Sequence, residues 1–289
     1  MSIITLTTDF GLSDGYVGTM KGVILTIAPD VRLVDISHEI APQNIRQAAY
    51  VLHAAAPYFP AGTIHVAVVD PGVGSARRAL VARTRRGFFV GPDNGVFTLC
   101  LAAAPDAECH AITNPAYGLP RVSATFHGRD VFAPAAAHLA LWLCHSEARR
   151  AGESLGYTSE THRPTRGDMV NLDEFGPRID APVTFAIPQP IQLPDGNWLA
   201  HVLYADYFGN LITSATQDLL NSIGNVEILI GQRRIVRLSR TFADASPGDL
   251  VALVGSSGHL EISVVNGHAA QSLGLGPDAP LTLSKMQEG

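Results

Sequence analysis

The first half of the chain alternates short apolar runs with segments of helical periodicity, and this alternation constrains the fold more than any other feature. The strand-like runs are 3–8, 31–35, 64–69, 79–82, 87–90 and 109–112, and the helical segments are 17–28, 44–58, 95–103 and 130–144. Strands that alternate with helices form βαβ units, which place neighbouring strands parallel in one sheet. We therefore expect an α/β N-terminal domain with a mainly parallel sheet over residues 1–172.

A proline-rich segment then interrupts this pattern. Residues 173–192 lack helical periodicity and contain Pro177, Pro182, Pro188 and Pro190, which predicts a linker. Short alternating runs follow at 199–204, 226–230, 234–238, 250–254 and 259–264. Because Gly, Ser, Asp and Asn separate these runs, we expect a small all-β, barrel-like C-terminal domain over residues 193–289.

Composition narrows the possible functions. Hydrophobic residues make up 46% of the 289 residues and charged residues 16%, which is typical of a compact globular protein. The net charge of −6 leaves no basic field for nucleic acid. The longest apolar run, Val131–Cys144, contains Pro134 and His138 and is shorter than the ~20 residues that span a bilayer. We expect neither a nucleic-acid partner nor a membrane partner.

The cysteines and the N-terminal residues point to the cytoplasm. Cys100, Cys109 and Cys144 form no CxxC pair, which fits free thiols in a reducing compartment. The chain also runs directly into the apolar segment 3–8 without the basic region of a signal peptide. Cytoplasmic localisation is therefore the expectation.

Three aspartates directly follow predicted strands. They are Asp9 in a TDFG segment, Asp70 in a VDPGVG segment and Asp93 in a GPDNG segment. The carboxyl ends of strands in open α/β sheets face the ligand crevice, so these carboxylates are candidates for one site. An aspartate at such a position is equally able to cap the following turn. A strand end with an acidic residue and no phosphate-binding loop suits a nucleoside better than a nucleotide.

A histidine and an arginine extend this candidate site. His127 lies in the FHGRD segment before the longest predicted helix, and Arg77 follows the glycine turn after Asp70. Together the three side chains could form a relay in which the carboxylate orients the imidazole and the guanidinium lowers its pKa. A loop histidine alone is more often structural.

The second half contains further candidates that also have structural explanations. Asp206 and Asn210 share the segment YADYFGN, which is also typical of a β-turn, and Ser256 lies in a GSSG segment that could form a hairpin. Backbone amides in such a segment could instead hold a carboxylate. Phe242 is either a core aromatic residue or a surface on which a ring stacks.

Taken in order, these motifs resemble the S-adenosylmethionine (SAM) hydrolases, or hydroxide adenosyltransferases, which are related to the fluorinase and the chlorinase. The resemblance extends over nearly the whole chain and is carried by 8–11, 69–74 with Arg77, 92–95, 126–130 with 137–139, 206–210, 241–244, 255–258 and Asn266.

The resemblance implies a homotrimer whose active sites lie between the N-terminal domain of one subunit and the C-terminal domain of the next. It implies that Asp70, Arg77 and His127 form the catalytic triad, which would polarise or deprotonate a water that attacks C5′ of the ribose of SAM. The products would be adenosine and L-methionine. SAM is then the small-molecule substrate, and neither a cofactor nor a metal is expected.

The same resemblance assigns the substrate-binding residues. Asp9 would accept the ribose hydroxyls, Asp206 would bind the methionine ammonium and Ser256 its carboxylate. Phe242, Asn210 and the backbone near Asn266 would form the adenine pocket.

Two departures separate the chain from its halide-using relatives. Asp70 and His127 stand where those enzymes carry tyrosines, which favours water as the nucleophile. Gly128 stands in place of a halide-binding serine, and Ser257 replaces an arginine for the methionine carboxylate.

Three other functions stay open at this point. One is a halide-using adenosyl transferase, and another is a nucleoside-binding sensor without turnover. The third is a metal-dependent phosphoesterase with oxygen and nitrogen ligands chosen from Asp9, Asp14, Asp70, Asp93, His127 and Asp130.

Overall fold

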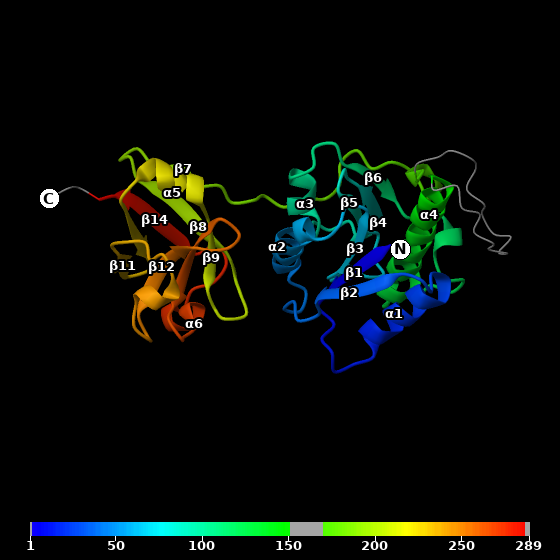
Figure 1. Ribbon diagram of the computed structural model, residues 1–289, viewed down its shortest axis with the longest axis horizontal. Coiled ribbons are helices and arrows are strands. Elements are labelled where there is room, and N and C mark those ends of the chain that lie inside the picture. The colour runs from blue at the N-terminus through cyan, green and yellow to red at the C-terminus, as the bar shows by residue number, and fades with distance from the viewer. Residues whose placement is uncertain (1, 151–169, 287–289) are drawn as a thin grey trace. The chain divides into compact units, whose positions relative to one another are not determined.

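A computed structural model describes residues 2–150 and 170–286 of the chain. The chain divides into two compact units, Met1–Phe185 and Ala186–Gly289. Figure 1 shows the two units with their elements, and each is described by itself below.

The first unit is built on a six-stranded sheet in the order β2-β1-β3-β5-β4-β6. Its strands are β1 (Ile3–Thr8), β2 (Arg32–Ser37), β3 (Thr63–Val68), β4 (Ala79–Arg83), β5 (Gly87–Pro92) and β6 (Glu108–Ala111). Strands β2, β1, β3 and β5 pair in parallel, whereas β4 is antiparallel to both β5 and β6. The expected mainly parallel sheet is confirmed, with one reversed strand.

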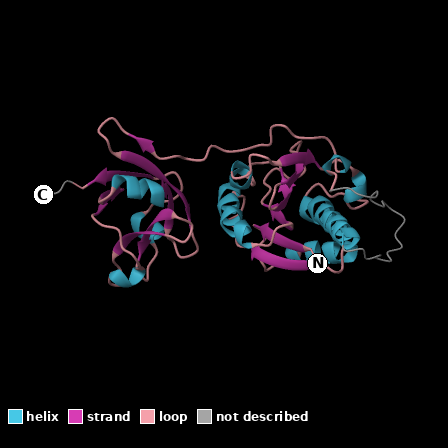
Figure 2. Ribbon diagram, turned by 45° about the horizontal axis from the view of Figure 1, so that its top comes forward, coloured by secondary structure: helices cyan, strands magenta, loops and turns pink. Residues whose placement is uncertain are grey.

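Helices cover both faces of this sheet, as Figures 1 and 2 show. They are α1 (Tyr16–Ile27), α2 (Ile45–Ala55), α3 (Thr98–Ala102) and α4 (Ala133–Arg150), with a short 3-10 helix η1 (Ala56–Tyr58) after α2. Helices α1 and α4 bury Met20, Ile24 and Leu139 against one face. Helices α2 and α3 bury Leu52 and Cys100 against the other. Each fully buried side chain of this size contributes about 1.5–3 kcal/mol, so both layers hold the sheet in place.

The helix expected at 130–144 begins differently in the structure. A π-helical turn, η3 (Gly128–Phe132), precedes α4, whose first residue is Ala133. Such turns are rare and frequently lie at functional sites. This one directly follows His127.

The second unit is an antiparallel, nearly closed barrel with the strand order β11-β10-β14-β8-β9-β13-β12. Its strands are β7 (Ile191–Gln192), which pairs with β8, then β8 (Trp198–Ala205), β9 (Leu211–Thr216), β10 (Val226–Ile230), β11 (Arg233–Ile235), β12 (Leu250–Val254), β13 (His259–Val264) and β14 (Pro280–Lys285). The Ser239 amide, beyond β11, donates to the Ala252 carbonyl of β12, which brings the two ends of the sheet together. The expected barrel-like domain is confirmed, although it also carries two short helices, α5 (Gln217–Ile223) and α6 (Ala269–Leu273).

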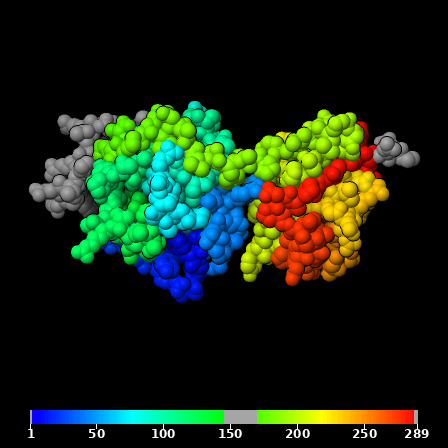
Figure 3. All heavy atoms as spheres, turned by 180° about the vertical axis from the view of Figure 1, so that it is seen from behind, coloured from blue at the N-terminus to red at the C-terminus, as the bar shows by residue number. Residues whose placement is uncertain are grey.

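Part of the proline-rich segment 173–192 packs on the first unit. Phe175 and Ile179 are buried in the cores of that unit, and the amide of Ile179 donates to the Cys109 carbonyl of β6. Figure 3 shows residues of this segment as a yellow-green band on the surface of the first unit. The division between the units comes after Phe185.

Among the helices that the structure describes, none combines the length and the apolar character that a bilayer crossing needs.

Candidate active site

A buried ion pair joins Asp70 and Arg77 at the carboxyl end of β3. The Nε atom of Arg77 donates to both oxygens of Asp70 at 3.0 Å, and its Nη2 donates to Oδ2 at 2.5 Å. The two side chains are only 5% and 10% exposed. The guanidinium carbon also lies 5.2 Å from the ring centroid of Phe132, so the aromatic ring packs against the guanidinium in a cation–π contact. The pair is therefore fixed in one geometry, since bidentate contact leaves the fork little freedom.

His127 joins the Asp70–Arg77 pair, because its Nδ1 lies 2.7 Å from Nη2 of Arg77. A guanidinium only donates hydrogen bonds, so Nδ1 is the acceptor. The neutral imidazole consequently carries its proton on Nε2. Burial, together with the charge of Arg77, lowers the pKa of His127 below its usual value of 6.5. At neutral pH the ring is thus an uncharged group that presents an N–H.

Glycine at position 74 brings the loop of His127 to the turn of Asp70. Gly74 has a φ of +76°, and a Cβ atom there would lie 2.4 Å from the carbonyl oxygen of Ala124. That oxygen belongs to the loop that leads to His127, three residues later in the chain. The close approach requires a residue without a side chain.

The other end of this loop is fixed by Asp130. Its fully buried carboxylate accepts hydrogen bonds from Nε of Arg129 at 2.5 Å and from the amide of Ser123 at 2.7 Å. His127 therefore lies between two fixed positions, Ala124 against Gly74 and the buried Asp130.

Asp9 extends from the end of β1, the strand that pairs with β3, and is anchored by a neighbouring segment. One carboxylate oxygen accepts the amide of Gln43 at 2.8 Å, and Gln43 adopts a left-handed φ of 65°. The amide of Gly11 donates to the carbonyl of His38 at 2.8 Å. The strand-end rule thus places Asp9 and Asp70 at the same edge of the sheet.

Sequence reasoning missed the side chains that hold the turn containing Asp9. Nδ1 of the buried His38 lies 2.8 Å from the hydroxyl of Thr8, and its Nε2 lies 3.0 Å from Asp35. The Thr8 hydroxyl also accepts the amide of Phe10. His38 directly follows β2, and the sequence gives no signal of this role because Thr8 is 30 residues away in the chain.

Aromatic residues near the loop of His127 were also missed. The rings of Phe10, Tyr16 and Phe126 contact one another with centroid separations of 5.1–5.8 Å, and Tyr16 is 49% exposed. Phe10 and Phe126 lie beside Gly128, where a Cβ atom would be 3.1 Å from the sulfur of Met20 and 3.2 Å from Phe126. A serine at this position would be crowded.

Asp93 is a structural residue despite its similar place in the sequence. Its side chain is 1% exposed, pairs with Arg78 and accepts the amide of Val183. Over residues 2–150 and 170–286, moreover, no three His, Cys, Asp or Glu side chains form a group able to hold a metal ion.

In the second unit, Asp206 and Asn210 are joined directly. Both oxygens of Asp206 accept hydrogen bonds at 2.8 Å, one from the backbone amide and one from the side-chain amide of Asn210. Gly209, with a φ of +81°, closes this turn and leaves no space for a side chain beside His268.

The remaining predicted residues of the second unit lie on its loops. Phe242 is 43% exposed and begins a 3-10 turn closed by a capping box of Thr241 and Asp244. Ser256 and Asn266 are exposed, and Asn266 has a left-handed φ of 52°. These side chains are available to a ligand, but no hydrogen bond among the described residues joins them.

A carboxylate that the sequence did not indicate lies near the Asp206 turn. Burial, and then the charge of Asp206, raise the pKa of Glu261. The Glu261 side chain lies against Gly255, where it occupies the space of a Cβ atom. It belongs to β13, whose alternating pattern gave no reason to single it out.

Comparisons with known proteins agree with this arrangement. The family model for the N-terminal domain of SAM hydroxide adenosyltransferases matches residues 4–147, and the model for the C-terminal domain matches residues 200–282. The chain is 38% identical to a protein of Salinispora arenicola named (R)-S-adenosyl-L-methionine hydrolase, with 97% of each chain covered. A protein of the same name from Thermus thermophilus is 41% identical, with 95% of this chain and 96% of the relative covered.

More distant relatives and a solved structure complete the comparison. A fluorinase of Actinopolyspora mzabensis is 27% identical over 90% of each chain. The crystal structure of an uncharacterized conserved protein from Thermotoga maritima matches with a TM-score of 0.80 and 31% identity, covering 98% of this chain and 100% of that one. On these grounds the chain belongs to the SAM hydroxide adenosyltransferase family.

Proposed function

We propose that the protein hydrolyses S-adenosyl-L-methionine by attack of water at C5′ of the ribose, giving adenosine and L-methionine. The observation that carries this function is the buried Asp70–Arg77 ion pair with His127 bonded to the same guanidinium. The relatives that are 35–41% identical over nearly their full length are named for this activity. Their names carry an (R) descriptor, and because the sulfonium sulfur is a stereocentre, we expect the R epimer to be the substrate.

The geometry suggests how one water molecule is held and activated. His127 donates its Nε2–H to the water oxygen, and Asp70 accepts one of the water hydrogens with a lone pair that Arg77 leaves unused. The remaining lone pair of the water points at C5′. As the new C–O bond forms, the C5′–S bond breaks and its electrons stay on sulfur as a neutral thioether, while the proton passes to Asp70 and then to solvent.

Positioning contributes more than proton transfer in this scheme. The sulfonium is already a good leaving group and needs no acid. General base assistance contributes roughly 10²–10⁴-fold, whereas a near-attack geometry contributes about 7–11 kcal/mol to lowering the barrier. His127 thus acts mainly as an orienting donor.

We propose the same substrate-binding roles that the family resemblance implies. Asp9 accepts the ribose hydroxyls, and Phe242, Asn210 and the backbone at Asn266 bind adenine. Asp206 binds the methionine ammonium and Ser256 its carboxylate. The exposure of Phe242, Ser256 and Asn266 and the anchored carboxylate of Asp9 support these roles.

The direct test is to incubate the purified protein with SAM and to measure adenosine and methionine by chromatography. Equal amounts of both products are expected, unchanged by a chelator and by added chloride or fluoride. No product from SAM, together with chelator-sensitive hydrolysis of a nucleotide phosphoester, would favour the metal-dependent phosphoesterase. A halogenated adenosine would favour halide transfer, and binding of SAM without product would favour a sensor. Gly128 has no hydroxyl to bind a halide, and an added Cβ atom there would be crowded by Met20 and Phe126.

We further propose a cytoplasmic homotrimer in which each site combines two subunits. The three free cysteines fit a reducing compartment, and the candidate residues divide between the two units of the chain. The triad and Asp9 belong to the first unit, and the adenine- and methionine-binding residues belong to the second.

Mixing two inactive variants tests the shared site. Asp70→Asn disables the first unit and Asp206→Ala the second. In randomly mixed trimers about a quarter of sites combine two intact halves, so about that fraction of wild-type turnover is expected. A mixture no more active than its separate parents would place each site within one subunit.

The pH dependence of kcat/KM tests the state of His127. Because burial and Arg77 lower the pKa of His127 below 6.5, the ring is neutral above that pH and becomes protonated only below it. Protonation of His127 at Nδ1 would place an N–H against the N–H of Arg77 and remove the hydrogen bond between the two side chains. We expect kcat/KM to be level between about pH 7 and 8 and to fall below pH 6.5. An acid limb centred above pH 7 would contradict this assignment.

A further inference from the structure

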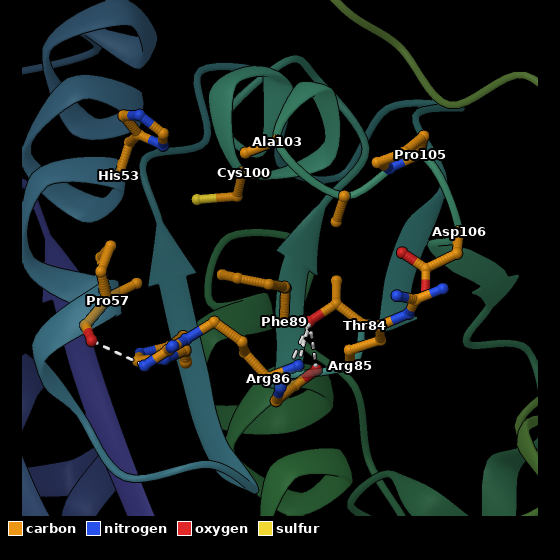
Figure 4. Close-up of a pocket in the computed structure, with 14 residues that line it drawn as sticks. His53, Pro57, Thr84, Arg85, Arg86, Phe89, Cys100, Ala103, Pro105 and Asp106 are labelled. Atoms are coloured by element: carbon orange, nitrogen blue, oxygen red, sulfur yellow. Dashed lines mark hydrogen bonds and ion pairs between the residues drawn. The ribbon is translucent and has the colours of Figure 1, made fainter.

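A cavity of about 380 Å³ opens at the edge of the first unit's sheet where β3 and β5 begin. Asp70 follows the opposite end of β3, so this cavity is separate from the triad. Figure 4 shows its walls: the end of α2 with η1, the turn between β4 and β5, and the end of α3. Its volume lies in the range of small-molecule pockets.

The interior of the cavity is apolar. In Figure 4 the side chains of Cys100 in α3 and of Ala103 directly after it lie on the side of the cavity opposite Arg86, with Phe89 between them and Arg86. Burial raises the pKa of the Cys100 thiol to about 12, so the sulfur stays protonated and packs as an uncharged group. This interior would exclude an ion.

A buried histidine supplies a polar atom to this largely apolar wall. His65 lines the cavity and is only 4% exposed, and its ring stacks on Phe89 at 5.3 Å. Its Nδ1 is bonded to the hydroxyl of Thr5 at 2.8 Å, whereas its Nε2 has no hydrogen bond within the described residues and is not among their enclosed unpartnered atoms, so it is accessible from the cavity. Burial lowers the pKa of His65 to about 4, which keeps the imidazole neutral. A ring nitrogen that is accessible from an apolar cavity and has no protein partner can form a hydrogen bond with a ligand.

The charged groups at the mouth are already paired. Nη2 of Arg86 donates to the carbonyl of Pro57 at 2.7 Å, a contact drawn in Figure 4, and Nε of Arg85 donates to Asp106 at 2.7 Å. The Arg85 side chain is 86% exposed and directed to solvent. Because Arg85 and Arg86 already have partners, a ligand does not need a charged group to pair with them.

We propose that this cavity binds a small, flat, uncharged aromatic molecule whose single hydroxyl or ring nitrogen bonds to Nε2 of His65. The ring occupies the space between Phe89 and the end of α3. This site is independent of the proposed hydrolase activity, since none of its lining residues belongs to that site.

The test uses 2-naphthol as the probe, with calorimetric titration of the full-length protein. A hydroxyl both donates and accepts, so it suits either tautomer of His65. We expect saturable binding of one molecule per chain and at least about tenfold weaker binding of 2-methylnaphthalene, which has a methyl group in place of the hydroxyl. 2-Naphthoate, an anion of the same shape, should also bind more weakly.

Two variants locate the binding. His65→Phe keeps the aromatic shape and should weaken 2-naphthol about tenfold while leaving 2-methylnaphthalene unchanged. Ala103→Trp, at an exposed position, fills the cavity without disturbing the core and should abolish binding while SAM turnover persists. Absence of saturable binding, equal binding to Ala103→Trp, or tighter binding of 2-naphthoate would overturn the proposal.

Discussion

Asp70→Asn is expected to lower SAM turnover by about 10²–10⁴-fold and to destabilise the fold by about 3–5 kcal/mol. The carboxylate is 5% exposed and is bonded to both Nε and Nη2 of Arg77. Without its charge, the guanidinium is left buried and uncompensated, and the attacking water loses its proton acceptor. Steady-state kinetics and urea unfolding measure the two effects separately.

The matched control for this variant is an exposed ion pair. Asp180→Asn breaks the pair between Arg178 and Asp180, whose side chains are 64% and 90% exposed. It should change stability by less than about 1 kcal/mol and leave turnover as in the wild type. If Asp70→Asn were as active and as stable as Asp180→Asn, the triad would have no catalytic role.

Gly74→Ala should disable the site without touching a catalytic side chain. The new Cβ would lie 2.4 Å from the carbonyl oxygen of Ala124, so the loop leading to His127 must move. A displacement of about 1 Å in such a site can lower the rate about 10²-fold. We expect a loss of kcat of that size, measured with saturating SAM.

Gly62→Ala is the control that separates the effect of loop displacement from the effect of backbone strain. Gly62 has a φ of +86°, similar to the +76° of Gly74, but no atom lies within 4 Å of the added Cβ. Both variants should lose about 1–3 kcal/mol of stability through strain at a left-handed residue. Only Gly74→Ala should lose activity, and an equal loss in both variants would contradict the role of the Gly74–Ala124 contact.

The strand-end rule predicted more of the site than any single motif did. It selected Asp9, Asp70 and Asp93 because the carboxyl ends of parallel strands share an edge, and the structure places Asp9 and Asp70 after adjacent strands. It could not show that Asp93 is used to bind Arg78 and the amide of Val183, since both partners come from other segments. The sequence alone cannot distinguish a carboxylate bonded within the protein from one open to substrate.

The residues alone offered the contact between His127 and Arg77 only as one hypothesis, and the resemblance made it a definite expectation. His127 lies far along the chain from Arg77, and the contact depends on a glycine that approaches a backbone oxygen in another loop. The π-turn at Gly128–Phe132 was also hidden, because apolar periodicity predicts a helix but not an extra residue in one of its turns.

The measurement that tests the central claim most directly is hydrolysis in water labelled with oxygen-18, followed by mass spectrometry of both products. Attack at C5′ predicts that the label appears in the 5′-hydroxyl of adenosine and that methionine stays unlabelled. Unlabelled adenosine, or label on the methionine-derived product, would show that water attacks elsewhere and would contradict the mechanism built on Asp70, Arg77 and His127.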